Sequence, residues 1–142
     1  MTRRSARLSR IAQLKALARQ RMERNLGDDL RSLAQSRQQH EMLLDYQSTY
    51  QDSSGPAMNA SALRNRQSFL QSIGRAITQQ ETRVKLDVDK VKTSRANWIK
   101  AWRNAKAMDE WVSEVERREH TDRLRRQQSL ADEMLNTRYR RD

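Results

Sequence analysis

The feature that most constrains this chain is an apolar stripe in its second half with a period of 3.5 residues. Positions spaced alternately by three and four residues are apolar at eleven of fourteen places. This period puts them on one face of an α-helix, which must coil around a partner helix to keep that face covered. The stripe therefore predicts a coiled coil. Its members are Leu70, Ile73, Ile77, Gln80, Val84, Asp87, Val91, Ser94, Trp98, Ala101, Ala105, Met108, Val112 and Val115.

The partner helix is expected to come from the same chain. The only strong turn signal is Asp52-Ser53-Ser54-Gly55-Pro56, which contains the single proline. We predict one domain over residues 1–142, with a helix over 5–51, a turn over 52–58 and a second helix over 59–138. Asn59 or Ser61 is expected to cap the second helix. A short connection makes two helices antiparallel, so the predicted fold is all-α, a long two-helix coiled-coil hairpin.

The two predicted helices differ in length. If the turn centres near Gly55–Pro56, the chain start lies opposite Trp111, and residues 112–142 overhang without an internal partner. Apolar residues of the first half are less regular and suggest a register shift near Gly27. Two interpretations of Gly27 and Gly74 stay open. Either the helix simply tolerates a glycine at these positions, or a second helix approaches closely there.

Three polar residues interrupt the stripe, one heptad apart. Gln80, Asp87 and Ser94 are expected opposite Ser32, Asn25 and Ala18 of the first helix. Polar residues in such a seam lower stability but fix register and partner choice. The alternative is that Val88 and its neighbours shift the contact line sideways. The sequence does not decide between these two hypotheses.

The composition argues against an enzyme. Only 35% of residues are hydrophobic and 33% are charged, so a thick core and a desolvating cleft are not expected. The chain has no cysteine and no glycine-rich phosphate loop. His40 and His120 cannot face each other in the predicted pairing, and the carboxylates are scattered among arginines. We expect no catalysis, no metal and no cofactor. No stretch is apolar enough to span a membrane, and a cytoplasmic location is predicted.

The net charge of +11 is concentrated near the N-terminus, where residues 1–24 carry +7. A basic surface favours an acidic protein, a nucleic acid or an anionic membrane. The aromatic residues are not interleaved with the basic arm, which disfavours nucleic acid. A membrane-surface helix over residues 5–24 lacks a bulky aromatic anchor. A nucleic-acid partner also predicts affinity that falls steeply with salt.

An aromatic cluster is predicted near the turn. Tyr46 and Tyr50 are one helical turn apart, with Leu43 and Gln39 before them. Across the turn, Phe69, Ile73, Ala76 and Gln80 are spaced by four, three and four residues. The predicted pairing puts Leu43 opposite Phe69 and Gln39 opposite Ile73. Exposed aromatic clusters mark binding sites.

These segments carry a family resemblance. MLLDYQSTY (42–50), FLQSIGRAITQQ (69–80) and WIKAWRNAKAMDEW (98–111) resemble the FliJ family of the bacterial flagellar type III export apparatus, over about residues 10–125. The stalk of virulence-type secretion systems is a related alternative that the LDYQ segment disfavours. The resemblance implies a non-enzymatic cytoplasmic protein, similar to the gamma stalk of rotary ATPases and attached to the membrane only through its partners.

The resemblance also implies partners and sites. FliJ proteins bind the export ATPase (FliI), which FliH regulates, promote its ring assembly, engage the gate protein FlhA and handle substrate chaperones; no nucleic-acid partner is implied. The implied gate-binding residues are Gln39, Leu43, Tyr46, Tyr50, Phe69, Ile73, Ala76 and Gln80. By the stalk analogy the terminal end enters the ATPase ring. We expect ring contacts from Arg3, Arg4, Arg7, Arg10, Arg117, Arg118, Arg123, Arg125 and Arg126.

Overall fold

The chain folds into two long helices that pack against each other. The computed structural model describes residues 2–52 and 59–141. Within these, α1 spans Arg3–Asp52, α2 spans Ala60–Arg141, and no strand occurs. The all-α coiled-coil prediction is confirmed. The predicted turn over 52–58 lies outside the described residues except for Asp52, which ends α1. The division into helices 5–51 and 59–138 of one domain stays a prediction.

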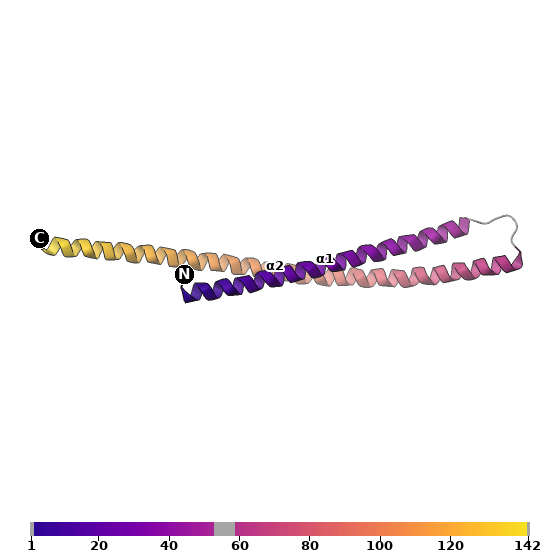
Figure 1. Cartoon of the computed structure of the whole chain (residues 1–142), viewed down its shortest axis with the longest axis horizontal. Coiled ribbons are helices and arrows are strands. Elements are labelled where there is room, and N and C mark those ends of the chain that lie inside the picture. The colour runs from indigo at the N-terminus through magenta and orange to yellow at the C-terminus, as the bar shows by residue number, and fades with distance from the viewer. Residues whose placement is uncertain (1, 53–58, 142) are drawn as a thin grey trace. The chain divides into compact units, whose positions relative to one another are not determined.

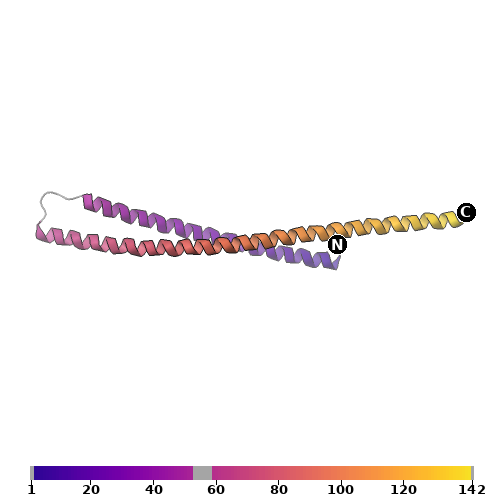
Figure 2. The same ribbon diagram turned by 180° about the vertical axis from the view of Figure 1, so that it is seen from behind.

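Contacts along the helices define two compact units. The terminal unit combines Met1–Arg21 with Ile99–Asp142, and the central unit spans Met22–Trp98. In each unit the segments of α1 and α2 run antiparallel (Figure 1, Figure 2). Every residue of the predicted stripe from Leu70 to Val115 is buried or half-buried. The apolar stripe of α2 is therefore the seam of the coil.

The seam of α1 is more regular than its apolar residues suggest. Its burial keeps the three-and-four alternation past Gly27, so the predicted register shift is wrong. The apolar residues of α1 suggested a shift because several seam positions hold polar side chains, while the apolar Leu14, Leu17 and Leu30 are exposed. The seam positions that are buried or half-buried are Ser5, Leu8, Ala12, Arg19, Met22, Leu26, Asp29, Leu33, Ser36, His40, Leu43 and Gln47, and beside them Ala6, Ser9, Ile11, Ala16 and Gly27 are half-buried.

The polar residues of α2 lie inside the seam. The Gln80 amide donates to the carbonyl oxygen of Ser36 at 2.9 Å, and the Ser94 hydroxyl donates to the carboxylate of Asp29. Asp87 is only 2% exposed. These positions contradict a sideways displacement of the contact line. Neither Gly27 nor Gly74 marks a close approach of the second helix. A Cβ added at Gly27 would meet only the Arg31 side chain, and one added at Gly74 would meet nothing within 4 Å.

The pairing register differs from the prediction. Gln80 meets Ser36 rather than Ser32, and Ser94 meets Asp29 rather than Ala18. The reason lies at the turn end, where Arg66 of α2 donates to the backbone of Gln51 in the last turn of α1. The first two turns of α2 thus continue past the end of α1 (Figure 1). The predicted register assumed that both helices end level.

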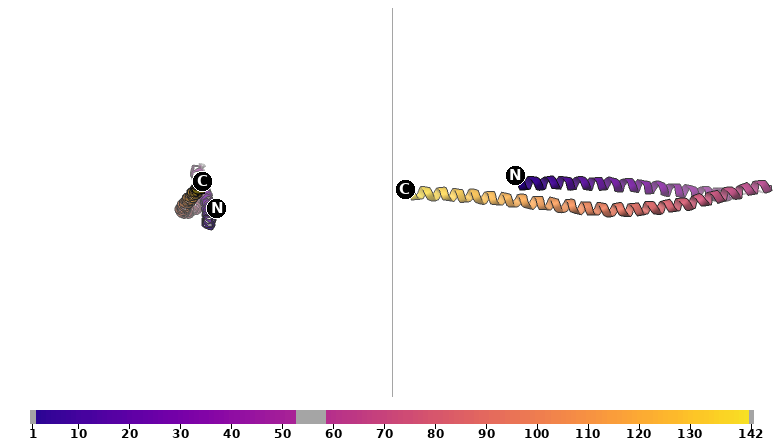
Figure 3. Two further views of the ribbon diagram at one scale, coloured as in Figure 1. Left: turned by 90° about the vertical axis from the view of Figure 1, so that its left-hand side faces the viewer. Right: turned by 90° about the horizontal axis from the view of Figure 1, so that it is seen from below.

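The helix overhang is real but begins later than residue 112. Val115 is buried, and Glu119 accepts a hydrogen bond from the hydroxyl of Thr2. From Asp122 to Arg141 every residue is exposed. In the terminal unit this part of α2 continues past the start of α1 (Figure 3). The shift in register explains the correction, since the chain start pairs with Glu119 instead of Trp111.

Candidate protein-binding surfaces

An aromatic patch lies near the end of α1 in the central unit. The rings of Tyr50 and Phe69 have centroids 4.4 Å apart at 49°, a tilted contact between the two helices. Tyr46 is 61% exposed and Phe69 46% exposed. The predicted pairing of Leu43 with Phe69 is wrong, because the register places Tyr50 there. Aromatic side chains so exposed offer a large area for a partner.

The polar part of the predicted gate-binding set is also joined across the helices. The Gln80 side-chain amide donates to Oε1 of Gln39 at 3.2 Å, so Gln39 meets Gln80 and not Ile73 as predicted. Ile73 is buried in the seam, while Leu43 and Ala76 are half-buried. The structure thus brings the set together from both helices. Its solvent-facing members are Gln39, Tyr46, Tyr50 and Phe69.

Further residues extend this surface around α1. Met42, Asp45 and Thr49 line a shallow depression with Tyr46. Sequence reasoning missed them, although Met42 and Thr49 are one turn before and after Tyr46 and therefore share its face. A second omission is Arg66, whose guanidinium Nη2 donates to the carbonyl oxygens of Tyr50 at 3.1 Å and Gln51 at 2.7 Å.

The start of α1 is fixed by a polar cluster in the terminal unit. The Ser5 backbone N–H donates to Oγ1 of Thr2 at 3.2 Å, and the Ser5 hydroxyl donates to the Thr2 carbonyl at 3.0 Å. Thr2 is thus the N-cap of α1. Its hydroxyl donates to Glu119 of α2, and this bond lowers the pKa of the Glu119 carboxyl. Sequence reasoning missed this cap, although Thr2, with Ser5 three residues later, is a visible capping signal.

The predicted ring-binding arginines of α1 are exposed on its first turns. Arg4 lines a groove with residues of α2 that include Trp111, Glu114 and Arg118. Arg3, Arg7 and Arg10 are exposed as well. The first turn of α1 contains Arg3 and Arg4 and no acidic residue, so these two cations lie at the positive end of the helix dipole. An acidic partner would relieve that repulsion.

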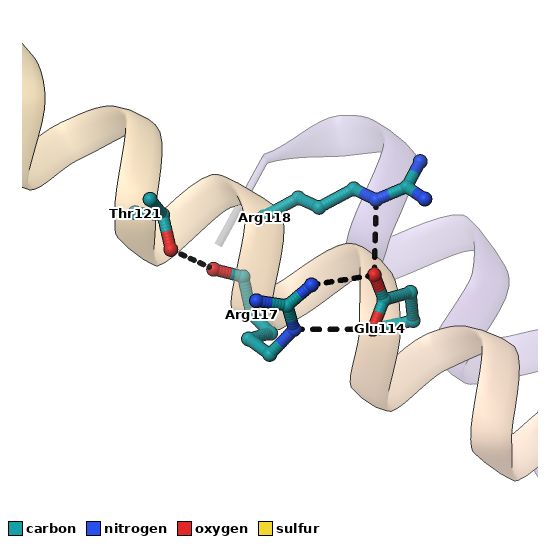
Figure 4. A network of polar contacts seen from close by, with 4 residues as sticks. All are labelled: Glu114, Arg117, Arg118 and Thr121. Atoms are coloured by element: carbon teal, nitrogen blue, oxygen red, sulfur yellow. Dashed lines mark hydrogen bonds and ion pairs between the residues drawn. The ribbon is translucent and has the colours of Figure 1, made fainter.

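Two of the predicted arginines on α2 are held by a carboxylate. Arg117 donates to Glu114 from Nε at 3.1 Å and from Nη2 at 2.8 Å, and Arg118 donates from Nε at 3.1 Å (Figure 4). These hydrogen bonds lower the pKa of Glu114 to about 2. The Thr121 hydroxyl donates to the Arg117 carbonyl at 3.0 Å. The last paired turns of α2 therefore present a fixed charge network.

The remaining arginines begin the overhang. Arg123, Arg125 and Arg126 are exposed, and within residues 2–52 and 59–141 none of them forms an ion pair. Arg123 and Arg126 line a depression with Thr2, Glu119 and Asp122. Further along, exposed apolar side chains face solvent beside them. These are Leu124, Leu130, Met134, Leu135 and Tyr139.

The described part of the chain, residues 2–52 and 59–141, offers neither a membrane span nor a metal cluster. No helix there is long and apolar enough to cross a bilayer. No group of three or more histidine, cysteine or carboxylate side chains is placed to hold a metal ion within those same residues.

Comparison with known proteins gives the family. The family model described as "Flagellar FliJ protein" matches residues 4–142. The Flagellar FliJ protein of Escherichia coli (strain K12) is 32% identical over 105 residues, which cover 65% of this chain and 71% of that protein. No solved structure matches. The chain therefore belongs to the FliJ family and is a component of the flagellar export apparatus.

Proposed function

We propose that this chain is a non-enzymatic, cytoplasmic adaptor that connects two parts of the flagellar export machinery. One end binds the export ATPase ring (FliI, with its regulator FliH) as a central stalk and promotes ring assembly. The other end binds the export gate protein (FlhA). Substrate chaperones are a third class of partner, and the chain reaches the membrane only through the gate.

The observation that carries the gate assignment is the exposed aromatic patch built from both helices. The Tyr50–Phe69 contact fixes one side of it, and Tyr46 offers an exposed ring and hydroxyl beside it. Tyrosine is enriched in binding hot spots because its ring buries a large area and its hydroxyl bonds polar groups. A coiled coil needs neither exposed ring for its own seam.

The ATPase assignment rests on the terminal unit. Beyond Asp122 a single exposed helix carries apolar and basic side chains with no internal partner among the described residues. Such a helix buries its apolar residues only against another protein. The basic residues at its start and on the first turns of α1 favour an acidic lining. A central stalk inside an ATPase ring with an acidic inner surface would need these properties.

The first experiment replaces Tyr46 and Tyr50 together by alanine. We expect loss of binding to the purified cytoplasmic domain of the gate protein, measured by calorimetry, with unchanged helicity by circular dichroism. The reason is that hot-spot aromatics each contribute about 2 kcal/mol or more, so two of them change affinity by roughly a thousandfold. Tyr139→Ala, which removes an exposed tyrosine from the overhang, is the matched control. Equal affinities of the double variant and the control would refute the gate assignment.

A further inference from the structure

Arg66 reaches from one helix to the backbone of the other. It belongs to the second turn of α2 and is half-buried. Its guanidinium Nη2 donates to the carbonyl oxygens of Tyr50 and Gln51, at 3.1 Å and 2.7 Å. Both carbonyls lie in the last turn of α1, which ends at Asp52. The contact is thus a cap on the C-terminus of α1 supplied by α2.

The last turn of α1 carries no positive charge of its own. The last four carbonyls of a helix have no intrahelical donor, and the helix dipole makes them partly negative. The last turn of α1 contains no basic residue, and it ends in a carboxylate at Asp52. A charged guanidinium offers several donors in a rigid plane and forms strong hydrogen bonds to carbonyl oxygens. Arg66 therefore supplies donors to two of these carbonyls and the positive charge that the last turn of α1 lacks.

The same contact fixes the position of Tyr50. Arg66 holds its backbone carbonyl, and Phe69, one turn further along α2, contacts its ring. Residues three apart on a helix lie on one face, so Arg66 and Phe69 hold Tyr50 from adjacent points of α2. Without the backbone contact, the Tyr50 and Gln51 carbonyls lose the donor that Arg66 supplies, and the last turn of α1 is free to fray.

We propose that Arg66 is a positioning residue of the aromatic patch. It touches the backbone of the last turn of α1, and through it keeps the Tyr50 ring against Phe69 in the arrangement that a partner binds. The effect on affinity rests on the proposed gate-binding function, whereas the effect on the ring contact does not. Preorganised side chains bind more tightly because less ordering remains to be done on association.

The experiment compares Arg66→Gln with Arg66→Lys and two controls in the full-length chain. Arg64→Gln removes an exposed charge from the same part of α2. Asn59→Ala removes the N-cap of α2, in which the Asn59 side-chain oxygen accepts from the Ala62 N–H at 2.8 Å, and so weakens a helix end away from Tyr50. The readouts are the ring proton shifts of Tyr50 and Phe69, amide exchange at residues 48–51, and the Kd for the gate's cytoplasmic domain.

We expect Arg66→Gln to move the ring shifts toward random-coil values, to speed amide exchange over 48–51 and to weaken gate binding about 3- to 10-fold, the range for ordering one or two side chains. Arg66→Lys, which keeps the charge and has three N–H donors on one nitrogen but lacks the planar guanidinium, gives intermediate values. Both controls leave the ring shifts and the Kd unchanged. The proposal is overturned if Arg66→Gln behaves like Arg64→Gln, or if Asn59→Ala weakens binding as much.

Failure of the proposed function is separable from failure of this inference. If the unaltered chain does not bind the gate domain, the proposed function falls. The ring shifts and amide exchange of the free protein still decide whether Arg66 positions Tyr50. If these change in Arg66→Gln while the Kd of a binding-competent chain stays the same, the patch needs no preorganisation and the proposal is overturned.

Discussion

The same helix, α2, is built in two ways along its length. Between Leu70 and Val115 its apolar face is covered by α1, whereas from Asp122 to Arg141 every residue is exposed. Both parts carry leucine, methionine or aromatic residues at helical spacing. The difference lies in the presence of a partner, not in composition. An amphipathic face predicts that something covers it, but does not say whether that cover is in the same chain.

The paired part is itself not uniform. Ile73 and Ile77 fill the seam with aliphatic side chains, while Asp87 puts a carboxylate there. Gln80 and Ser94 on either side of Asp87 satisfy their polar groups across the seam. Among residues 2–52 and 59–141, Asp87 Oδ2 has no hydrogen-bond partner, and Nε of Arg83 on the same helix lies 3.6 Å from it. The seam therefore has a strong aliphatic end and a weaker polar middle.

Removing the overhang gives the largest functional effect that this comparison predicts. A chain ending at Thr121 loses the exposed residues but keeps the Thr2–Glu119 bond and the whole seam. We expect its free energy of unfolding, measured by denaturant titration, to stay nearly unchanged, because exposed residues contribute little to stability. Stimulation of the export ATPase should be lost.

The control for this deletion is the Tyr46→Ala, Tyr50→Ala chain, which should stimulate the ATPase normally while failing to bind the gate domain. Full stimulation by the truncated chain would show that the overhang is not the ring contact.

Core truncation should separate the two parts of α2 by stability. Ile77→Ala removes a seam side chain that is 8% exposed and leaves a cavity. The expected loss in the free energy of unfolding is about 2–4 kcal/mol. Leu130→Ala removes an apolar side chain that is 61% exposed, and the expected change is within about 0.5 kcal/mol. Equal losses on denaturant titration would mean that the overhang is covered in the free protein.

Replacing the buried carboxylate should stabilise the polar middle. Asp87→Val exchanges an incompletely bonded charge for an aliphatic side chain of similar helix propensity. Because burying such a charge is costly, we expect a gain of about 1–3 kcal/mol in the free energy of unfolding. Asp89→Val, at an exposed position two residues away, should change it by less than about 0.5 kcal/mol. A loss at Asp87 would show that its carboxylate is well paired in solution.

The seam residues of α2 could be predicted from the sequence, and those of α1 could not, because the two seams differ in chemistry. The seam of α2 is mostly aliphatic, so each of the fourteen positions that its period predicted between Leu70 and Val115 is buried or half-buried. The seam of α1 contains Arg19, Asp29, Ser36 and His40. A polar residue in a seam cannot be told from a surface residue by sequence. Several leucines of α1 are exposed, so its apolar residues do not mark the seam. The cap of α2 was predicted as Asn59 or Ser61, because both carry a side-chain oxygen just after the turn, and the structure shows that Asn59 is the cap.

The pairing register could not be predicted for a different reason. Each contact across the seam depends on where the two helices end at the turn, and helix ends are uncertain by a few residues from sequence alone. A shift there moves every facing pair, which is why Tyr50 rather than Leu43 meets Phe69. The eight predicted residues still lie along one side of each helix because of their spacing. Their contacts across the helices differ from the predicted ones, Ile73 is buried in the seam, and their role in gate binding stays a prediction.

The smallest predicted effect lies at the last paired turns of α2. Arg117 and Arg118 hold the pKa of Glu114 at about 2, against an ordinary value of 4.5. Because the pKa is lower in the folded chain, the stabilisation is complete above pH 4.5 and is lost as pH falls toward 2. The carboxyl is solvent-exposed, so the change in overall stability should be slight. A carbon-detected NMR titration of Glu114 should give a midpoint near 2, and Arg117→Gln with Arg118→Gln should raise it toward 4.5. A midpoint that stays low without both arginines would mean that another group, such as Arg4 of the same groove, holds the charge.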